Sequence, residues 1–262
     1  MNILEEDTVL VNEGVVAQVM INRPQALNAI TVDIFQGLIM AFEKIERFPD
    51  LRVVTLWGAG DKAFAAGVEV NGYMDLGKRA LAEYVELGNR ALRTVERCKV
   101  PVIAAVNGYC FGAGLEVALA ADVIVAGHSA QFGFPEVSLG AVPPFGGIAR
   151  LVQRVGVGVA KKLLFSGEMI DAQEALLAHL VDEVAEPEKL TDTVNHLAET
   201  ITTRAPLAVE AIKKIIREVS DNNVFPAIRR SIEVYLDLAK SSDWGEGADA
   251  FMQQRAPKFT GR

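Results

Sequence analysis

The first two thirds of the chain alternates short apolar runs with longer stretches in which apolar residues recur at every third or fourth position. Residues 15–21 and 53–57 are short apolar runs bounded by turn-forming residues, which predicts buried strands. Between them, Thr31 is a candidate N-cap for a helix. The apolar positions of that helix are Ile34, Phe35, Leu38, Ile39, Phe42 and Ile45. Alternation of this kind predicts an α/β core.

The same alternation continues to about residue 127. A second amphipathic helix is predicted to place Leu81, Tyr84, Val85, Leu92 and Val95 on one face. Residues 101–106 form a predicted strand, a helix begins near Gly112, and residues 123–126 form another strand. Residues 100–127 are largely apolar, but they include a proline, acidic residues and four glycines. A helix facing lipid would leave these polar groups unmatched, so we interpret the segment as core.

From about residue 190 the pattern becomes wholly helical. Pro206 suits a first helical turn and precedes one apolar stripe. The members of this stripe are Ala208, Ala211, Ile212, Ile215, Ile216 and Val219. A second stripe consists of Ile228, Ile232, Tyr235 and Leu236. We therefore predict a core of residues 1–190 that holds the functional site. Residues 191–262 are predicted to form a helical C-terminal subdomain that packs on the core or on a neighbouring subunit and provides oligomer contacts.

Composition restricts the class of function. The 262 residues are 50% hydrophobic, which allows one large core, and the net charge is −8. A negative charge disfavours nucleic acid and anionic membranes as partners, because both attract basic surfaces. The acidic first residues do not resemble a signal or transit sequence, and two cysteines are too few for a disulfide framework. We expect a cytoplasmic protein.

Two carboxylates stand out because their surroundings are apolar. Glu116 lies in a predicted helix that is apolar on every side, and Glu136 follows an apolar segment with proline and glycine. Buried carboxylates are costly unless they are paired or hydrogen-bonded, and residues 100–149 contain no lysine or arginine. Each could cap backbone donors or pair with a distant arginine. If they instead share a dry pocket, their pKa values are driven apart, leaving one proton donor and one acceptor.

Two stretches of small residues are candidates for backbone recognition. Residues 108–114 follow a strand and open a helix, so unpaired N–H groups at the helix N-terminus could meet a ligand. Residues 64–70 could supply another N–H group. Close packing of a turn is the structural alternative for either stretch. The histidines, His128, His179 and His196, lack metal-ligand spacing, so we expect no metal site.

Several ordered motifs together resemble the crotonase superfamily of enoyl-CoA hydratases and isomerases. Residues 21–29 are similar to its N-terminal motif, and residues 62–67 and 101–116 resemble its two oxyanion-hole segments. Residues 130–140 resemble the segment with the second catalytic acid. Residues 145–147 and 164–168 continue the resemblance. The fold it implies is a spiral of ββα turns with a helical C-terminal region, usually assembled as a homotrimer or a dimer of trimers.

The resemblance also implies roles for individual residues. The oxyanion donors fall on the N–H groups of Val68 and Ala113, and the two catalytic acids fall on Glu116 and Glu136. Residues expected to contact coenzyme A or the acyl group are Arg23, Ala26, Leu27, Lys62, Ala65, Ala66, Gly67, Glu69, Val70, Asn71, Gly112, Phe134 and Pro144. The two basic residues of this set are the weaker candidates, proposed for the phosphates.

The implied reaction is reversible hydration of a trans-2-enoyl-CoA, with no metal or redox cofactor because coenzyme A belongs to the substrate. A Δ3,Δ2-enoyl-CoA isomerase needs only one acid, so two glutamates favour the hydratase. Other acyl-CoA lyases or hydrolases use the same enolate chemistry. Phe134 and Pro144 depart from the usual family residues. If they block the acyl channel, the protein would be a non-catalytic acyl-CoA-binding protein.

Overall fold

The computed structural model describes residues 8–69, 77–221 and 240–262. Six strands form the larger of its two sheets, in the order β1-β2-β3-β5-β7-β10. β1 pairs antiparallel with β2, and the remaining neighbours are parallel. β3 and β5 are buried at every residue, as expected for parallel strands covered on both faces. The bounds are β1 Val9–Asn12, β2 Val16–Ile21, β3 Val53–Gly58, β5 Val102–Val106, β7 Val123–Gly127 and β10 Glu183–Ala185.

The second sheet has four strands in the order β4-β6-β8-β9. Its first three strands are parallel, and β9 runs antiparallel to β8. Along the chain β4 follows β3, β6 follows β5 and β8 follows β7, so successive turns place one strand in each sheet before the next helical segment. The predicted spiral of ββα turns is thereby confirmed. The bounds are β4 Ala63–Ala66, β6 Tyr109–Phe111, β8 Gln131–Gly133 and β9 Ile170–Asp171.

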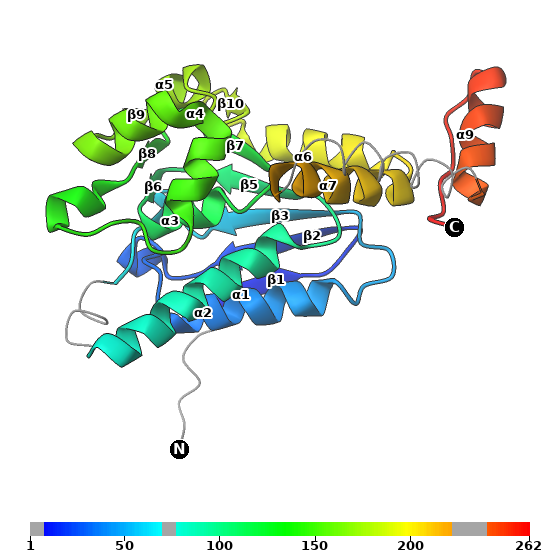
Figure 1. Cartoon of the computed structure of the whole chain (residues 1–262). Coiled ribbons are helices and arrows are strands. Elements are labelled where there is room, and N and C mark those ends of the chain that lie inside the picture. Colours follow the sequence, from blue (N-terminus) through cyan, green and yellow to red (C-terminus); the bar gives the residue numbers. More distant parts are fainter. Residues whose placement is uncertain (1–7, 70–76, 222–239) are drawn as a thin grey trace.

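Helices cover both faces of the larger sheet. α1 and α2 lie together on one side, and α6 crosses the other side (Figure 1). Alternate residues of a strand point to opposite faces. Accordingly Trp57 and Ile103 pack with α6, whereas Leu56 and Ala104 belong to the core on the side of α1. The helical bounds are η1 Pro24–Ala26, α1 Val32–Ile45, α2 Lys78–Glu96, α3 Ala113–Ala118, η3 Pro135–Leu139, α4 Gly147–Ser166, α5 Ala172–Leu177, α6 Leu190–Thr202, α7 Pro206–Asp221 and α9 Ser242–Met252.

The predicted helices are confirmed, with one correction to a helical face. Thr31 caps α1 by accepting a hydrogen bond from the Ile34 N–H at 3.3 Å, and the six predicted apolar positions of α1 are buried. On α2 the predicted face is buried or half-buried except at Leu81, which is exposed. Leu81 lies in the first turn of α2, before the helix comes against α1 and the loop that precedes α4.

Beyond residue 190 the described elements are all helices, as the sequence predicts. α6 packs on the larger sheet, and α7 is joined to the core through Lys213, which binds the Asp122 carboxylate and the Val100 carbonyl. Ile212 and Ile216 in the stripe of α7 are exposed in the single chain, so they do not pack on its core, and packing on a neighbouring subunit stays a prediction. The second predicted stripe, residues 228–236, lies outside the described residues. The domain boundary at 190 stays a prediction.

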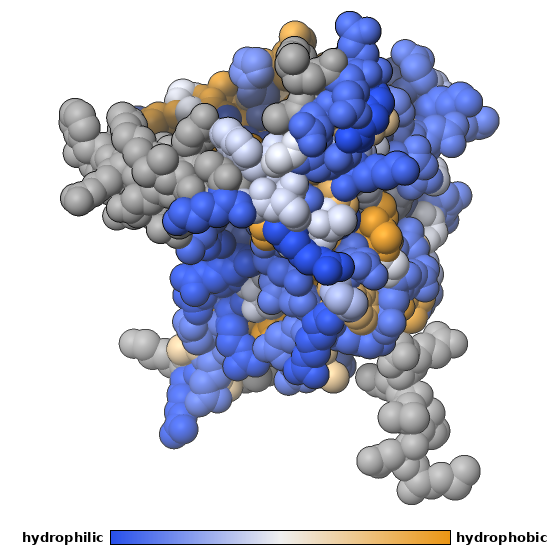
Figure 2. Space-filling view, turned by 90° about the vertical axis from the view of Figure 1, so that its right-hand side faces the viewer, coloured by the Kyte–Doolittle hydropathy of each residue, from blue (hydrophilic) through white to orange (hydrophobic). Residues whose placement is uncertain are grey.

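The C-terminal side of the molecule is mainly hydrophilic, with hydrophobic side chains in separate areas (Figure 2). In α9, Asp243 is buried and accepts hydrogen bonds from the N–H groups of Thr260 and Gly261, which holds the C-terminal tail against the helix. No helix within the described ranges is long and apolar enough to cross a bilayer. The apolar segment 100–127 instead forms β5, β6, α3 and β7.

Candidate active site

The candidate site lies where three parallel strands of the smaller sheet end together. Ala66 at the end of β4 pairs with Phe111 of β6, which in turn pairs with Gly133 of β8. Parallel strands with aligned carboxyl ends deliver their following loops to one edge of a sheet, a common position for ligand sites. Here those loops carry three of the predicted groups: Val68, Ala113 and Glu136.

The two small-residue loops approach each other directly. Gly112 has φ +49 and ψ −122, a conformation that a residue with a Cβ rarely adopts, and it lets the chain turn from β6 into α3. A Cβ placed on Gly112 would lie 3.7 Å from the Cα of Gly67 and 2.7 Å from Oε1 of Glu136. The Gly67 loop, the Gly112 turn and the second acid therefore converge, as the sequence predicts.

The predicted oxyanion donors have free backbone N–H groups. Ile30 forms a parallel bridge opposite Val68, donating its N–H to the Gly67 carbonyl and accepting from Glu69 N–H. This pattern directs the N–H of Val68 away from Ile30. Ala113 is the first residue of α3, where an N–H has no partner inside the helix. Neither N–H donates to an acceptor in the described part of the chain.

Glu116 is completely buried and is held by backbone donors. Its Oε1 accepts hydrogen bonds from the N–H groups of Phe145 at 2.8 Å and Gly147 at 2.7 Å. Gly147 opens α4, so the carboxylate also meets the positive end of that helix dipole. The alternative in which Glu116 caps backbone donors is therefore correct. It does not remove the catalytic hypothesis, because Oε2 is buried and has no partner among the described residues.

Burial dominates the ionisation of both acids. Burial raises the pKa of Glu116 to about 8; the two backbone donors oppose this rise, and the neighbouring charge of Glu136 adds to it. Burial also raises the pKa of Glu136, whose Oε2 likewise has no partner within the described ranges. Glu116 is buried and feels the charge of the half-buried Glu136, and each acid keeps one oxygen without a partner among the described residues, so the two can share a proton over a reacting molecule.

The N-terminal loop of residues 23–28 packs against the first oxyanion loop. Ala66 N–H donates to the carbonyl of Leu27, which has φ +51, and Arg23 forms an ion pair with Glu69 at 3.0 Å. Arg23 also donates to the Ala29 carbonyl. Asn28, which we did not single out from the sequence, is fully buried and ties this loop to the carbonyls of Ala59 and Ala63.

The remaining residues that were predicted to contact coenzyme A or the acyl group differ in their solvent exposure. Ala65 is buried in β4, whereas Lys62 is exposed just before it. Phe134 is buried at the start of η3, and Pro144 is exposed, with its carbonyl bound by Asn89. Ala26 is half-buried in η1. Val70 and Asn71 lie outside the described residues.

Comparisons with known proteins agree with this geometry. Residues 11–262 match the family described as enoyl-CoA hydratase/isomerase. The chain is 37% identical over 249 residues to a short-chain-enoyl-CoA hydratase of Clostridium acetobutylicum, covering 95% of each protein. It is 35% identical over 254 residues to a crotonyl-CoA hydratase of Syntrophomonas wolfei, covering 97% of this chain and 98% of that protein.

A solved structure, an enoyl-CoA hydratase from Bacillus anthracis, matches with a TM-score of 0.94 at 31% identity, covering 97% of this chain and 100% of that one. The ββα spiral is therefore the crotonase fold, and the protein is an enzyme of this class. The chain belongs to the enoyl-CoA hydratase/isomerase family. The family resemblance that the sequence motifs indicated is confirmed.

Proposed function

We propose that the protein catalyses the reversible hydration of a trans-2-enoyl-CoA to a 3-hydroxyacyl-CoA. The observation that carries this proposal is the pairing of the buried Glu116 with the half-buried Glu136 beside the Val68 and Ala113 N–H groups. In the described part of the chain, one buried oxygen of each acid has no hydrogen-bond partner. Addition of water needs one proton acceptor and one proton donor, whereas double-bond migration needs only one acid. The names of the relatives from Clostridium and Syntrophomonas support the same reaction.

In the proposed mechanism the thioester oxygen accepts hydrogen bonds from the N–H groups of Val68 and Ala113. Such a donor, placed where negative charge develops, is worth on the order of 3 kcal/mol of barrier. Glu116 takes a proton from water while the hydroxide oxygen bonds to the β-carbon. Glu136 gives its proton to the α-carbon of the enolate. The proton gained by Glu116 then replaces the one lost by Glu136, so the pair returns to its starting state.

Coenzyme A would lie along the first oxyanion loop and the N-terminal loop. Arg23 is already engaged by Glu69 and the Ala29 carbonyl, whereas the side chain of Lys62 is exposed and forms no hydrogen bond or ion pair with the described residues. Lys62 is therefore the better of the two candidates for a phosphate of coenzyme A. The proposed reaction requires no metal or redox cofactor.

The direct test follows the absorbance of crotonyl-CoA, which falls when its conjugated double bond is hydrated. Wild type should turn over, and Glu116→Gln and Glu136→Gln should each lose roughly 10²–10⁴-fold in kcat. Asp122→Asn is the matched control, because this half-buried carboxylate pairs with Lys213 away from the site. Binding without turnover would favour an acyl-CoA-binding protein. Turnover of a 3-enoyl-CoA alone would favour an isomerase, and activity in the double variant would end the proposal.

The pH dependence tests the division of roles. Water activation requires ionised Glu116, and burial raises the pKa of this carboxyl group to about 8. The kcat/KM for hydration should therefore increase with pH up to about 8. The measurement is kcat/KM for crotonyl-CoA across this range. A rate that decreases instead would give Glu116 the proton-donor role and Glu136 the water-activating role.

A further inference from the structure

The loop of residues 144–147 holds Glu116, and its own conformation depends on other groups. Phe145 and Gly147 aim their N–H groups at Oε1 of Glu116. Between them Gly146 has φ +87, in the left-handed region, so the loop is a tight and specific turn into α4. Any looseness of this turn would move both donors away from the carboxylate at once.

Arg150, one turn into α4, reaches back to this loop. Its Nη1 donates to the carbonyl of Phe145 at 2.9 Å, and its backbone N–H donates to Gly146. Phe145 thus joins the guanidinium to the carboxylate through a single residue, whose carbonyl accepts from Arg150 and whose N–H donates to Glu116. A Cβ on Gly146 would lie 2.6 Å from Nη1 of Arg150, so the small residue makes room for this contact.

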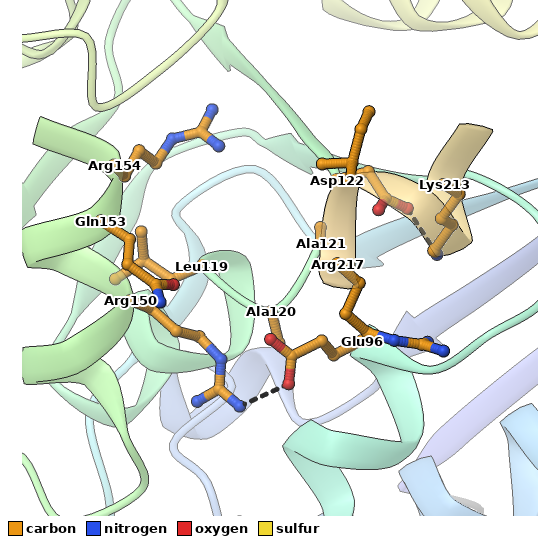
Figure 3. A pocket seen from close by; sticks show the side chains of 11 residues that line it. Glu96, Leu119, Ala120, Ala121, Asp122, Arg150, Gln153, Arg154, Lys213 and Arg217 are labelled. Atoms are coloured by element: carbon orange, nitrogen blue, oxygen red, sulfur yellow. Dashed lines mark hydrogen bonds and ion pairs between the residues drawn. The ribbon is translucent and has the colours of Figure 1, made fainter. Parts of the chain in front are cut away.

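The end of α2 fixes the guanidinium in turn. Nη2 of Arg150 pairs with the carboxylate of Glu96 at 3.0 Å. Both residues line a cavity of about 240 Å³ (Figure 3). The Arg150 side chain is 13% exposed and that of Glu96 is 39% exposed, so the guanidinium is shielded from water while the carboxylate is partly solvated. Asn89, also on α2, donates to the Pro144 carbonyl at 3.0 Å. The loop is therefore held from two helices.

The loop has a separate apolar anchor. The ring of Phe145 packs against Phe35 at 4.9 Å and Tyr84 at 5.6 Å between ring centroids, and Gly88 of α2 leaves room for it. This cluster does not involve the guanidinium. Removal of Arg150 is therefore expected to loosen the loop without removing it from the core.

We propose that Arg150, fixed by Glu96, is a positioning residue that holds the Phe145–Gly147 donors on Glu116 and so favours the ionised form of this acid. The charged groups that face Glu116 are Glu136 from η3 and Arg150 from α4, and they act with opposite sign. Loss of the guanidinium removes a favourable charge and relaxes two donors, and both changes disfavour ionised Glu116. The proposal rests on the role of Glu116 in the proposed hydration.

The test compares Arg150→Met with Arg154→Met. Arg154 lies one turn further along α4, lines the same cavity, pairs with Asp182 and binds the Leu180 carbonyl, but does not contact the loop. Arg150→Met should lower kcat for crotonyl-CoA by roughly tenfold or more, with a smaller change in KM, and should move the Glu116 limb of the pH profile upward. Arg154→Met should leave the profile in place. Equal behaviour of the two variants would overturn the proposal.

Two further variants separate positioning from folding. Arg150→Lys keeps the positive charge but cannot bind Phe145 and Glu96 at the same time through a planar guanidinium. Compared with Arg150→Met, it should bring the pH profile part of the way back to that of wild type, while kcat stays low. Glu96→Gln releases the guanidinium and should shift the profile in the same direction as Arg150→Met. Its control is Glu86→Gln, which breaks the exposed pair with Arg93 on the same helix. An unshifted profile in Glu96→Gln would contradict the role of Glu96.

A measurement that needs no turnover distinguishes failure of this proposal from failure of the proposed function. Unfolding in urea across pH should show that Arg150→Met changes the pH dependence of stability when residue 116 is glutamate, and not in the Glu116→Gln background. If wild type fails to hydrate crotonyl-CoA but this coupling is present, the positioning role stands and the reaction assignment falls. Absence of coupling would refute the positioning role whatever the activity.

Discussion

At the scale of single residues, Glu116 shows how opposing local effects set the state of a carboxyl group. Two short hydrogen bonds from backbone donors and the N-terminus of α4 favour the ionised form. Complete burial opposes them and prevails, because water no longer solvates the charge and the charge of Glu136 is near. The result is a carboxyl group that still holds its proton near neutral pH, which is unusual and suited to proton transfer.

The raised pKa of Glu116 predicts a pH-dependent loss of stability. The pKa of glutamate in an unfolded chain is about 4.3. Between this pH and about pH 8, Glu116 in the folded chain retains a proton that the unfolded chain has released. The free energy of unfolding should therefore fall as pH rises through this window, by up to roughly 1.4 kcal/mol for each unit of pKa difference. The stabilisation is fully present below the pKa that Glu116 has in the unfolded chain. It is lost as the pH rises above the pKa that Glu116 has in the folded chain.

Glu116→Gln removes this titration and keeps an oxygen that can accept from Phe145 and Gly147. Urea unfolding at a series of pH values should show a flatter decline of stability in Glu116→Gln than in wild type. Glu43→Gln, on the exposed face of α1, serves as the control and should retain the wild-type slope. A Glu116→Gln variant as pH-sensitive as wild type would show that another group is responsible.

At the scale of elements, the site depends on how closely backbone segments approach. The carboxyl ends of β4, β6 and β8 align, and glycine at the following turns allows the loops to meet. Glu116 on α3 reaches the start of α4 because Gly147 has no side chain in the way. A Cβ there would lie 2.5 Å from Cγ of Glu116, far inside van der Waals contact. The contact between Glu116 and Gly147 therefore both packs α3 against α4 and positions the carboxyl group.

Substitution of Gly147 should separate the two helices at this point. Gly147→Ala is expected to push Glu116 aside and to reduce kcat by roughly 10²-fold, because small displacements of a reacting group are costly. Gly158 lies in α4 beyond the kink at Gly156, and no atom is near its Cβ position. Gly158→Ala should therefore keep kcat and stabilise the fold by up to about 1 kcal/mol. Assays with crotonyl-CoA and urea unfolding measure both effects. Equal kcat in the two variants would contradict this packing argument.

At the scale of the whole molecule, the ββα spiral encloses the core and leaves several large apolar side chains on the outside. Leu139 after the second acid, Phe165 at the end of α4 and Leu177 at the end of α5 are 68%, 74% and 82% exposed. Where exposed apolar groups form a contiguous patch, they mark a surface that contacts another protein. They support the expectation that several copies of the chain associate.

We expect a homotrimer or a dimer of trimers. Light scattering after gel filtration should give three or six times the chain mass of 28.3 kDa. Burial of Leu139, Phe165 or Leu177 at such a contact would stabilise the assembly by roughly 1.5–3 kcal/mol for each side chain. Phe165→Asp should then shift the measured mass downward. A wild-type protein that is monomeric at micromolar concentration would refute the expectation.

The sequence by itself determined β2, β3, β5 and β7 and most faces of the predicted helices, because both depend on local periodicity. The short strands of the smaller sheet were not predicted from this pattern. Alternating segments predicted an α/β core. The ββα spiral and the convergence of Glu116 with Glu136 were implied by the family resemblance of motifs such as residues 108–116 and 130–140. The exposure of Leu81, Ile212 and Ile216 was not predictable, because a regular apolar stripe does not show which of its residues another element of the same chain covers.

Only the tertiary structure decided what surrounds each acid. Phe145, Gly147 and Arg150 are about thirty residues from Glu116, and Asn89 and Glu96 come from another helix. No local pattern links these positions, because hydrogen bonds between distant segments depend on how the loops close in space. For the same reason the sequence offered Arg23 as a candidate for the phosphates of coenzyme A, whereas the fold pairs it with Glu69. Residue types and spacing specify the elements, and packing specifies their partners.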